Sequence, residues 1–527
     1  MSISILLGVN TKSGGRLSSE QSSMDVLHYR LDLMVNPYKE TISGEVLIRF
    51  KLLKDVESLE IDLINKYSVS GTVLNGMSMS FKHRDNKVLI DNPGVPLFKS
   101  NELLIKYGGK PPKAKNPPWD GGVTWSLDNS GRHWVGVSCQ SVGAHTWFPC
   151  KEHPSDKAEG AEIYISVPDP LMAVSNGILK SIEKKENRWT KWKWETEYPI
   201  SPYNINFAVG DFETIEKNGF VLGEPLYMVY YVLPEKSLGA GDLLQEAESH
   251  LNFYARAFGQ YPWIKEKFGL VHTPFSGMEH QTLNAYGNNY KKTNFGYDFI
   301  LFHEMGHEWW GNFLSVSDWS DFWIHEGIDT YAEVMYIEET FGKEALKNFV
   351  KNKLKPNIKN KYPVVPKKNS TAENVSGNDV YYKAAYLLHM VRYLIGKEML
   401  WSSLKEYLYM PKELVDNQTS TEEFISLINE NSGMNISWLF NQFLYKAQIP
   451  TLIVANRIVK DKKFIDIKWD ERGFKMPIEI QYESYDGIRV KKLKATNKNV
   501  TMVIPKESSF VIDPEGWVLC KTIIMGN

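Results

Sequence analysis

One pentapeptide decides how this sequence is interpreted: His303-Glu304-Met305-Gly306-His307. It lies in a segment, 298–313, whose apolar residues recur at helical spacing. Residues four apart on a helix share one face, so both imidazoles can reach a single ion. Zinc accepts imidazole nitrogen readily, and a catalytic zinc site keeps one position open for water. The pattern therefore predicts a zinc site, with Glu304 beside it as the base that takes a proton from that water.

A catalytic zinc site needs a third protein ligand, and Glu326 is the candidate. Eighteen residues separate it from His307, and it opens the next helical segment, 327–340, so two helices can converge on one metal. The helix dipole alone also favours an acidic residue near a helix start. Together with the pentapeptide, we predict one zinc ion per chain, bound by His303, His307 and Glu326. Glu333, two turns later, is either a hydrogen-bond partner of a ligating histidine or a surface residue.

Composition excludes several classes of protein. With 527 residues, 43% of them hydrophobic, the chain can form several domains with large cores. Its net charge of −2 gives no sign of a nucleic-acid partner or an anionic-membrane anchor. No stretch has the length and apolarity of a membrane-spanning helix. We therefore expect a soluble protein, and a cytoplasmic location is favoured over a periplasmic or secreted one.

Cysteine usage is consistent with this. The chain has only three cysteines, Cys139, Cys150 and Cys520. An odd and sparse set makes a poor disulfide framework and a poor zinc-thiolate site. We expect them to be reduced, although Cys139 and Cys150 could pair if the protein is exported.

Changes in residue pattern along the chain predict a multidomain α+β fold. Residues 1–23 are expected to form a disordered leader. Alternating apolar residues over 24–212 predict an antiparallel β-sandwich-type domain, interrupted by a long loop at 117–134. The segment 213–447 is mainly helical with a small sheet, and 448–527 suits a small β-sandwich. Helices are expected over 242–258, 298–313, 327–340, 381–395 and 420–431, and strands of the small sheet over 226–232 and 268–272.

The metal motif and its surroundings resemble a known family. The pentapeptide is followed after 18 residues by Glu326, which lies within Trp323-Ile324-His325-Glu326-Gly327. This arrangement is similar to that of the gluzincin aminopeptidases, the family of aminopeptidase N and leukotriene hydrolase. The resemblance runs from about Asp25 to Ala447. It implies a β-sandwich N-domain, a thermolysin-like catalytic domain, a C-terminal β module and removal of residues from peptides with a free N-terminus.

Many members of this family carry a further helical domain after the β module. Because this chain stops at Asn527, we expect no such domain, and a more open cleft or one covered by another subunit.

The resemblance also implies a site for the substrate's amine. The family's G-x-M-E-N loop corresponds to Ser276-Gly277-Met278-Glu279-His280. Glu279 would bind the α-ammonium group, with Gly277 and Met278 in the same loop. A fixed carboxylate recognises a free amine by a charge-assisted hydrogen bond, which would hold the first peptide bond at the zinc.

This chain departs from the family at both ends of the loop. Ser276 replaces glycine and His280 replaces asparagine, which bears on the loop's geometry and on the fit of the first side chain. The segment Ser138-Cys139-Gln140-Ser141 matches the N-domain segment whose glutamine lines the amine site. Gln140 is therefore a further amine-binding candidate.

A tyrosine completes the predicted site. Val380-Tyr381-Tyr382-Lys383-Ala384 resembles the family's V-Y-E-K-G segment, which implies that Tyr381 donates a hydrogen bond to the oxyanion formed at the attacked carbonyl. Without the resemblance, a core tyrosine would be the simpler interpretation, and Tyr382 is the neighbour most easily confused with it.

Other functions remain open at this stage. The same zinc helix could serve an endopeptidase, which would cleave an N-acetylated peptide that an aminopeptidase leaves intact. A catalytically inactive scaffold would not need His303, Glu304, His307, Glu326 and Tyr381. The epoxide hydrolase activity of the leukotriene type uses a tyrosine at the position that is Ser376 here. The preferred N-terminal residue and the oligomeric state do not follow from the sequence.

Overall fold

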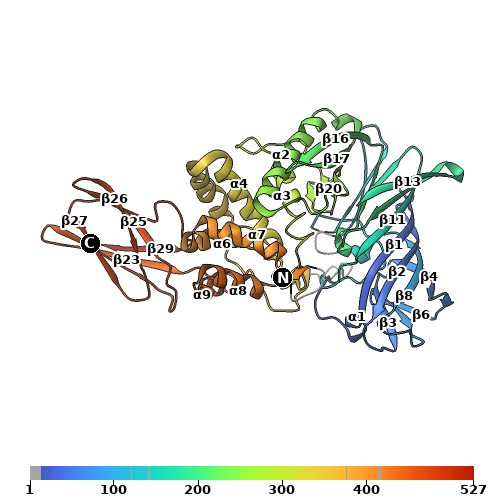
Figure 1. The fold of residues 1–527 in the computed structure, drawn as a ribbon, viewed down its shortest axis with the longest axis horizontal. Helices are drawn as coiled ribbons and strands as arrows, with labels where there is room; N and C mark the ends of the chain where they lie inside the picture. The colour runs from blue at the N-terminus through green and yellow to red at the C-terminus, as the bar shows by residue number, and fades with distance from the viewer. Residues whose placement is uncertain (1–12, 120, 140–142, 376, 413–416, 527) are drawn as a thin grey trace, which may run out of the picture. The chain divides into compact units, whose positions relative to one another are not determined.

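The computed structural model describes residues 13–119, 121–139, 143–375, 377–412 and 417–526. The chain forms two compact units (Figure 1). The first unit comprises Met1–Trp319, Lys368–Asn374 and Pro411–Thr419, and the second comprises Ser320–Lys367, Val375–Met410 and Ser420–Asn527. The boundary after Trp319 falls inside the segment 213–447 that the residue pattern predicts as one domain.

The N-terminal part of the first unit is built from β-sheets, as the alternating pattern predicts, but its largest sheet is mixed and not purely antiparallel, because alternation of buried residues does not distinguish the two kinds of pairing. Its largest sheet has eight strands, and β1 at its centre pairs parallel with β11 and antiparallel with β2. Every second side chain of β1 is buried over much of its length, because alternate residues of a strand point to opposite faces. In sheet order its strands are β13 (Ile178–Lys185), β14 (Trp189–Thr196), β11 (Gly160–Pro168), β1 (Met24–Asn36), β2 (Thr41–Leu52), β8 (Ser100–Gly109), β4 (Tyr67–Leu74) and β5 (Met77–Ser78).

Two smaller sheets belong to the same part of the first unit. One has the order β12 (Met172–Ser175), β15 (Phe207–Gly210), β10 (His133–Ser138) and β9 (Gly122–Leu127), and the other β3 (Ser58–Asp62), β7 (Lys87–Asp91) and β6 (Phe81–Arg84). The expected long loop at 117–134 therefore contains strand β9. Its backbone pairs antiparallel with the next strand, β10, from Gly122 to Leu127, and the composition of the segment does not reveal this hairpin.

Part of the expected leader is structured. Residues 19–22 form the short helix α1 (Ser19–Ser22), capped by the Ser18 side chain. Gln21 Nε2 donates to Asp62 Oδ2 at 2.6 Å, and Trp319 Nε1 donates to Ser13 Oγ at 3.0 Å. These partners are distant in sequence, so the segment's polar composition gave no sign of them. Residues 1–12 lie outside the described part of the chain.

A five-stranded mixed sheet completes the first unit, together with helices α2 (Ala240–Phe258) and α3 (Phe299–Gly306). Strands β17, β18 and β20 run parallel, and the edge strand β19 runs antiparallel to β20. In order the strands are β16 (Glu213–Val221), β17 (Glu224–Val232), β18 (Phe268–His272), β20 (Leu283–Tyr286) and β19 (Gly277–Met278). A two-stranded pair, β21 (Ser315–Val316) and β22 (Gln418–Thr419), also lies in this unit.

Buried polar contacts explain why this sheet belongs with the preceding β domain. The Lys267 ammonium donates to the carbonyl of Ser175 at 3.0 Å, and burial lowers its pKa to about 7. Glu266 accepts from Thr196 Oγ1 at 3.0 Å. Breaking such buried contacts would leave polar groups desolvated and without partners, so they join the two parts strongly.

The second unit begins with helices and ends with β-sheets. Its helices are α4 (Trp323–Phe349), α5 (Lys355–Asn357), α6 (Tyr382–Ile395), α7 (Lys397–Tyr409), α8 (Thr421–Ser432) and α9 (Ser437–Phe443). Helix α4 is longer than predicted and contains a non-helical residue, Gly342, with φ 84°. Helices α7 and α9 were not predicted from the pattern. Among the described residues, no helix combines the length and apolarity needed to cross a bilayer.

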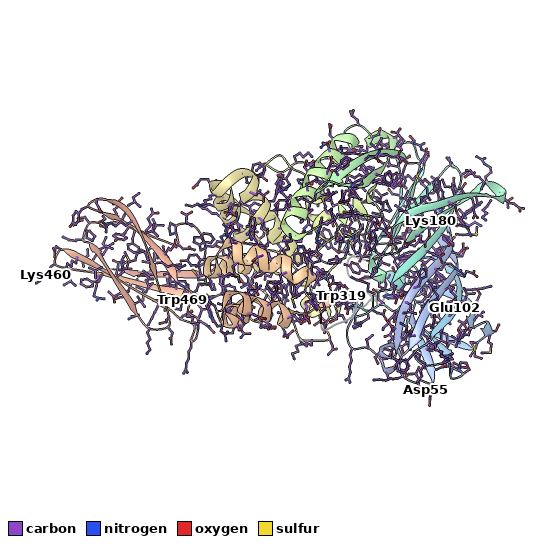
Figure 2. The ribbon with its side chains drawn as sticks, viewed as in Figure 1. Asp55, Glu102, Lys180, Trp319, Lys460 and Trp469 are labelled. Atoms are coloured by element: carbon purple, nitrogen blue, oxygen red, sulfur yellow. The ribbon has the colours of Figure 1, made fainter. Side chains whose placement is uncertain are left out.

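Two β-sheets form the C-terminal part of the second unit, in the segment 448–527 that the residue pattern predicts as a small β-sandwich. One sheet has the order β27 (Val500–Pro505), β24 (Lys462–Trp469), β23 (Thr451–Val459) and β29 (Lys521–Gly526), and the other β26 (Gly487–Leu493), β25 (Ile478–Ser484) and β28 (Phe510–Ile512). Trp469, labelled in Figure 2, is buried and donates from Nε1 to the carbonyl of Met476 at 2.8 Å. Lys460 lies in the turn between β23 and β24.

Gly327 allows α4 and α6 to pack closely in the second unit. A Cβ atom at this position would lie 2.4 Å from the Cβ of Ala384 and 3.0 Å from the carbonyl oxygen of Val380. Neither neighbour can rotate away, since one is a methyl group and the other is backbone. The glycine therefore sets the spacing between the start of α4 and the segment that precedes α6.

We expect Gly327→Ala to lower the free energy of unfolding by about 1–3 kcal/mol, because overpacking forces the two helices apart. Thermal or urea unfolding measures the change. Gly241→Ala is the matched control: Gly241 lies in α2 with no atom within 4 Å of the added Cβ, and alanine suits a helix better. Equal stability of the two variants would contradict the close packing.

Candidate active site

Helix α3 carries the first histidine of the pentapeptide, His303, and the second, His307, is its C-cap residue. The Asp298 side chain caps the helix by accepting from Leu301 N at 3.1 Å. Leu301, Phe302 and Met305 are buried, which fixes the face of the helix that packs inward. The His303 ring stacks on Phe299 with an interplanar angle of 17°. Local sequence thus holds the helix and the first imidazole in place.

The two imidazoles face each other with the geometry of a metal pair. His303 Nε2 and His307 Nε2 are 3.4 Å apart. Two nitrogens bound at 2.0–2.1 Å to a tetrahedral zinc ion would be about 3.3 Å apart. His307 Nδ1 lies 2.9 Å from the carbonyl oxygen of Trp310, which can only accept, so Nδ1 carries the proton and Nε2 keeps its lone pair. The pair therefore fits a zinc-sized cation.

The histidine pair depends on a chain reversal that the residue pattern did not reveal. The predicted helix over 298–313 ends at Gly306, seven residues early. Asn312 N then donates to the carbonyl of His307 at 2.9 Å, and Gly311 adopts φ 128°, which residues with a side chain rarely adopt. The prediction was wrong here because apolar spacing continues through Trp309 and Trp310 although the backbone turns.

Two carboxylates lie beside His307 in the first unit. One ligand atom from each of Glu279, Glu304 and His307 lies within 4.8 Å of the others. Gly277, in the edge strand β19, makes room for this arrangement: a Cβ there would lie 2.4 Å from Glu304 Oε1. The structure thus brings together Glu279, Glu304 and His307, as well as His303 and His307.

The loop that carries Glu279 is held by its backbone. Asn312 Nδ2 donates to the carbonyl of Glu279 at 2.9 Å, and Gly287 N donates to the carbonyl of Ser276 at 2.8 Å. Met278 lies in β19 and pairs with Ala285 of β20. His280 is buried, and this burial lowers its pKa to about 3, so the ring is neutral. The substitution of His280 for asparagine therefore adds no charge to the loop.

The other predicted residues meet in the second unit. Glu326 lies in the first turn of α4, and Tyr381 directly precedes α6. The Tyr381 hydroxyl donates to Glu326 Oε1 at 3.1 Å. Gly327, whose lack of a side chain brings these two segments together, directly follows Glu326. Glu333 is buried on the same helix.

Two further residues support the Tyr381 segment and were not predicted. The Asp379 carboxylate accepts from Lys359 N at 2.7 Å. The Lys383 ammonium donates to the carbonyls of Lys446 and Ala447 at 2.9 and 2.8 Å, and burial lowers its pKa to about 8. Lys383 belongs to the quoted Val380–Ala384 motif, so the signal was present, but its partners lie more than 60 residues away.

Two residues named in the sequence analysis lie outside the described residues, Gln140 and Ser376. The three cysteines are free thiols, and burial raises the pKa of both Cys139 and Cys150.

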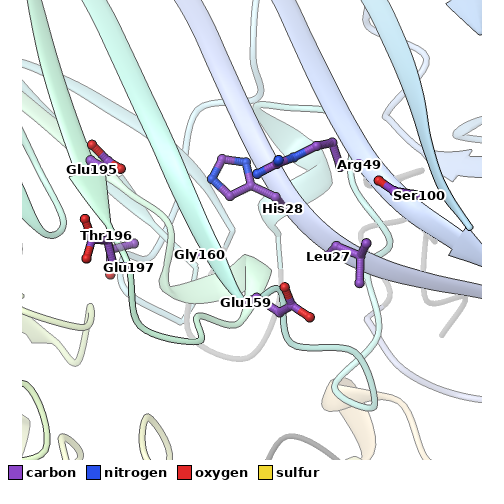
Figure 3. A pocket seen from close by; sticks show the side chains of 9 residues that line it. All are labelled: Leu27, His28, Arg49, Ser100, Glu159, Gly160, Glu195, Thr196 and Glu197. Carbon is purple, nitrogen blue, oxygen red and sulfur yellow. The ribbon is translucent and has the colours of Figure 1, made fainter. Parts of the chain in front are cut away.

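A separate pocket of 390 Å³ opens on the first unit at the ends of strands β1, β2, β11 and β14 (Figure 3). Its charged side chains include Arg49 and Glu195, and the imidazole of His28 also lines it. Burial and the nearby Arg49 guanidinium lower the pKa of His28 to about 4. The pocket contains none of the predicted site residues.

Comparison with known proteins agrees with the geometry. The Peptidase family M1 domain matches residues 244–443, and the Peptidase M1 N-terminal domain matches residues 26–204. The two matches do not overlap and together cover most of the chain. Their order is that of the β-rich part followed by the segment that carries the pentapeptide.

Individual relatives are distant. Glutamyl aminopeptidase of Sus scrofa is 25% identical over 351 residues, which is 62% of this chain and 36% of that protein. The chain thus spans little more than a third of this curated relative's length.

Two solved structures share the fold. Aminopeptidase A of Legionella pneumophila, solved with aspartic acid, has a TM-score of 0.80 at 16% identity and covers 98% of this chain, while the chain covers 61% of it. A mutant M1 zinc metallopeptidase from Deinococcus radiodurans, bound to a Tyr-Ser-Ala substrate, has a TM-score of 0.68 at 21% identity; the match covers 83% of this chain and 98% of that one.

The fold is the multidomain M1 peptidase fold, with a β-rich N-terminal domain followed by a helical catalytic domain. Because both domain models match in order and the histidine pair lies within the second of them, this chain belongs to peptidase family M1.

Proposed function

We propose that this chain is a zinc-dependent aminopeptidase that hydrolyses the N-terminal bond of peptides with a free N-terminus. The observation that carries the proposal is the 3.4 Å separation of His303 Nε2 and His307 Nε2, with the carboxylates of Glu304 and Glu279 beside His307. Membership in family M1 supports it. So do the relatives, among them a glutamyl aminopeptidase and a zinc metallopeptidase bound to a tripeptide.

We propose His303, His307 and Glu326 as the ligands of one zinc ion per chain. Two imidazoles and one carboxylate form a donor set that catalytic zinc sites use, with one position left open. The spacing of 18 residues between His307 and Glu326 supports this assignment. Bound there, zinc would supply a Lewis acid that polarises a carbonyl and activates water.

The remaining residues have roles in recognition and proton transfer. Glu279 accepts hydrogen bonds from the substrate's α-ammonium group, with Gly277 and Met278 shaping the loop and Gln140 as a further contact. Glu304 takes a proton from the attacking water and delivers it to the leaving nitrogen. Tyr381 donates to the carbonyl oxygen as it gains negative charge.

We expect Glu304→Gln to lower kcat by roughly 10²- to 10⁴-fold, because the amide cannot accept the proton. Zinc content, measured by elemental analysis, should stay at one per chain, since Glu304 is not a proposed ligand. The exposed Glu224 offers the control variant Glu224→Gln, which should keep full activity. Normal turnover by Glu304→Gln would remove the proposed base.

Tyr381→Phe should lower kcat by about 10²- to 10³-fold with little change in KM, because the lost hydrogen bond forms fully only in the transition state. Steady-state kinetics on aminoacyl fluorogenic substrates measures both constants. Tyr382→Phe removes the neighbouring hydroxyl and should leave kcat unchanged. If the two variants exchanged these outcomes, the role would belong to Tyr382.

Glu279→Ala should raise KM for substrates with a free amine by about 10- to 100-fold, which is the worth of one charge-assisted hydrogen bond. The wild-type protein should leave the matching N-acetylated peptides intact. Cleavage of those peptides by the wild type would indicate an endopeptidase. Absence of all hydrolysis by the zinc-loaded protein would indicate an inactive scaffold.

A further inference from the structure

Glu308, the residue after His307, has a side chain surrounded by hydrogen-bond donors. Its Oε1 accepts from Thr282 N at 3.0 Å and from Asn284 Nδ2 at 3.1 Å. Its Oε2 accepts from Trp263 Nε1 at 2.8 Å and from Asn312 Nδ2 at 3.0 Å. Because Thr282 and Asn284 directly follow the loop that carries Glu279, this carboxylate joins that loop to the end of helix α3.

Asn312 makes a second connection between the same two segments. Its Nδ2 also donates to the carbonyl of Glu279 at 2.9 Å. Its Oδ1 accepts from Asn204 Nδ2 at 2.9 Å, and the same Nδ2 lies 3.3 Å from the carbonyl of Glu279. Asn312 therefore holds the backbone carbonyl of Glu279, and Glu308 holds the backbone amide of Thr282, three residues later.

The loop needs this support because its own conformation is unfavourable. Thr282 has φ 60°, a left-handed conformation that is rare for a β-branched residue. Besides its bond to Glu308, it accepts at Oγ1 from Gly177 N at 2.8 Å and at its carbonyl from Gly269 N at 3.0 Å. Neighbouring segments thus impose the shape of the loop.

We propose that Glu308, acting through Asn312 and Thr282, is a positioning residue that sets where the Glu279 carboxylate stands beside His307. The proposal rests on the proposed function, because Glu279 must be the amine-binding group for its position to matter in catalysis. A carboxylate suits this role because both of its oxygens accept hydrogen bonds, and Oε1 also accepts from the Tyr261 hydroxyl at 3.5 Å. A glutamine would direct an NH₂ group at the donors that face one of the two oxygens and lose those bonds.

A purely structural role would give a different result. If Glu308 only stabilised the fold, its replacement would lower thermal stability and reduce the active fraction, which lowers kcat and leaves KM unchanged. A positioning role instead changes the loop locally, so KM for free-amine substrates rises while kcat changes much less. The split between the two constants separates these roles.

The test compares Glu308→Gln with Glu266→Gln in the full-length, zinc-loaded protein. Glu266 is a matched control because it is also a buried glutamate and accepts from Glu197 N at 3.0 Å and Thr196 Oγ1, away from the loop. For Glu308→Gln we expect roughly tenfold faster hydrogen exchange over residues 279–284 and a roughly tenfold higher KM. Zinc should remain at one per chain, and Glu266→Gln should change neither quantity.

Unchanged exchange over residues 279–284 together with an unchanged KM in Glu308→Gln would overturn the proposal. If this variant fails to fold, Asn312→Asp serves as the second test. It removes the NH₂ group that donates to the Glu279 carbonyl and to Glu308 Oε2, and it should produce the same faster exchange and higher KM. Rapid exchange of the Thr282 amide in the wild type would also overturn it, since that amide is expected to exchange as slowly as those of α3.

If the wild type fails to distinguish free from acetylated amines, the proposed function is wrong, and the exchange measurement still decides whether Glu308 anchors the loop.

Discussion

The chain reverses direction immediately after His307, and the arrangement of the histidine pair depends on that reversal. It brings the Trp310 carbonyl to the Nδ1 atom of His307 at 2.9 Å, which fixes the ring and its tautomer. The Nε2 lone pair then points toward His303 Nε2. An imidazole free to rotate would lose side-chain entropy on binding a metal, whereas this one is already oriented.

The same reversal places two polar side chains, Glu308 and Asn312, against the loop that carries Glu279. Both are buried, and a buried polar side chain is tolerated when its hydrogen bonds are satisfied. Their partners come from four other segments, the loop, strand β20, the segment between α2 and β18 that contains Trp263, and the N-terminal β part, so these bonds connect parts of the first unit that are far apart in the sequence. Recognition of the substrate's amine would then depend on packing well away from Glu279.

In the second unit a steric constraint positions the predicted site residues. Gly327 leaves no side chain between α4 and the segment before α6, so the Tyr381 hydroxyl reaches Glu326 at 3.1 Å. The side chains of Lys383 and Asp379 hold that segment by hydrogen bonds to backbone groups of Lys446 and Lys359. A proposed ligand and a proposed oxyanion donor therefore share one hydrogen bond, which orients both side chains before substrate binds.

The sequence by itself determined the local features. Four-residue spacing on a helix placed His303 and His307 on one face, alternation predicted the N-terminal strands, and the motif around Glu326 indicated the family. Tertiary structure decided the rest. It determined the end of α3 at Gly306, the fact that residues 13–23 are structured, the unit boundary after Trp319 and the hydrogen bonds around Glu308. The physical reason is that periodicity reports which face of an element is buried, whereas a helix end, a left-handed Thr282 or a buried carboxylate depends on donors and acceptors that lie far away in the chain.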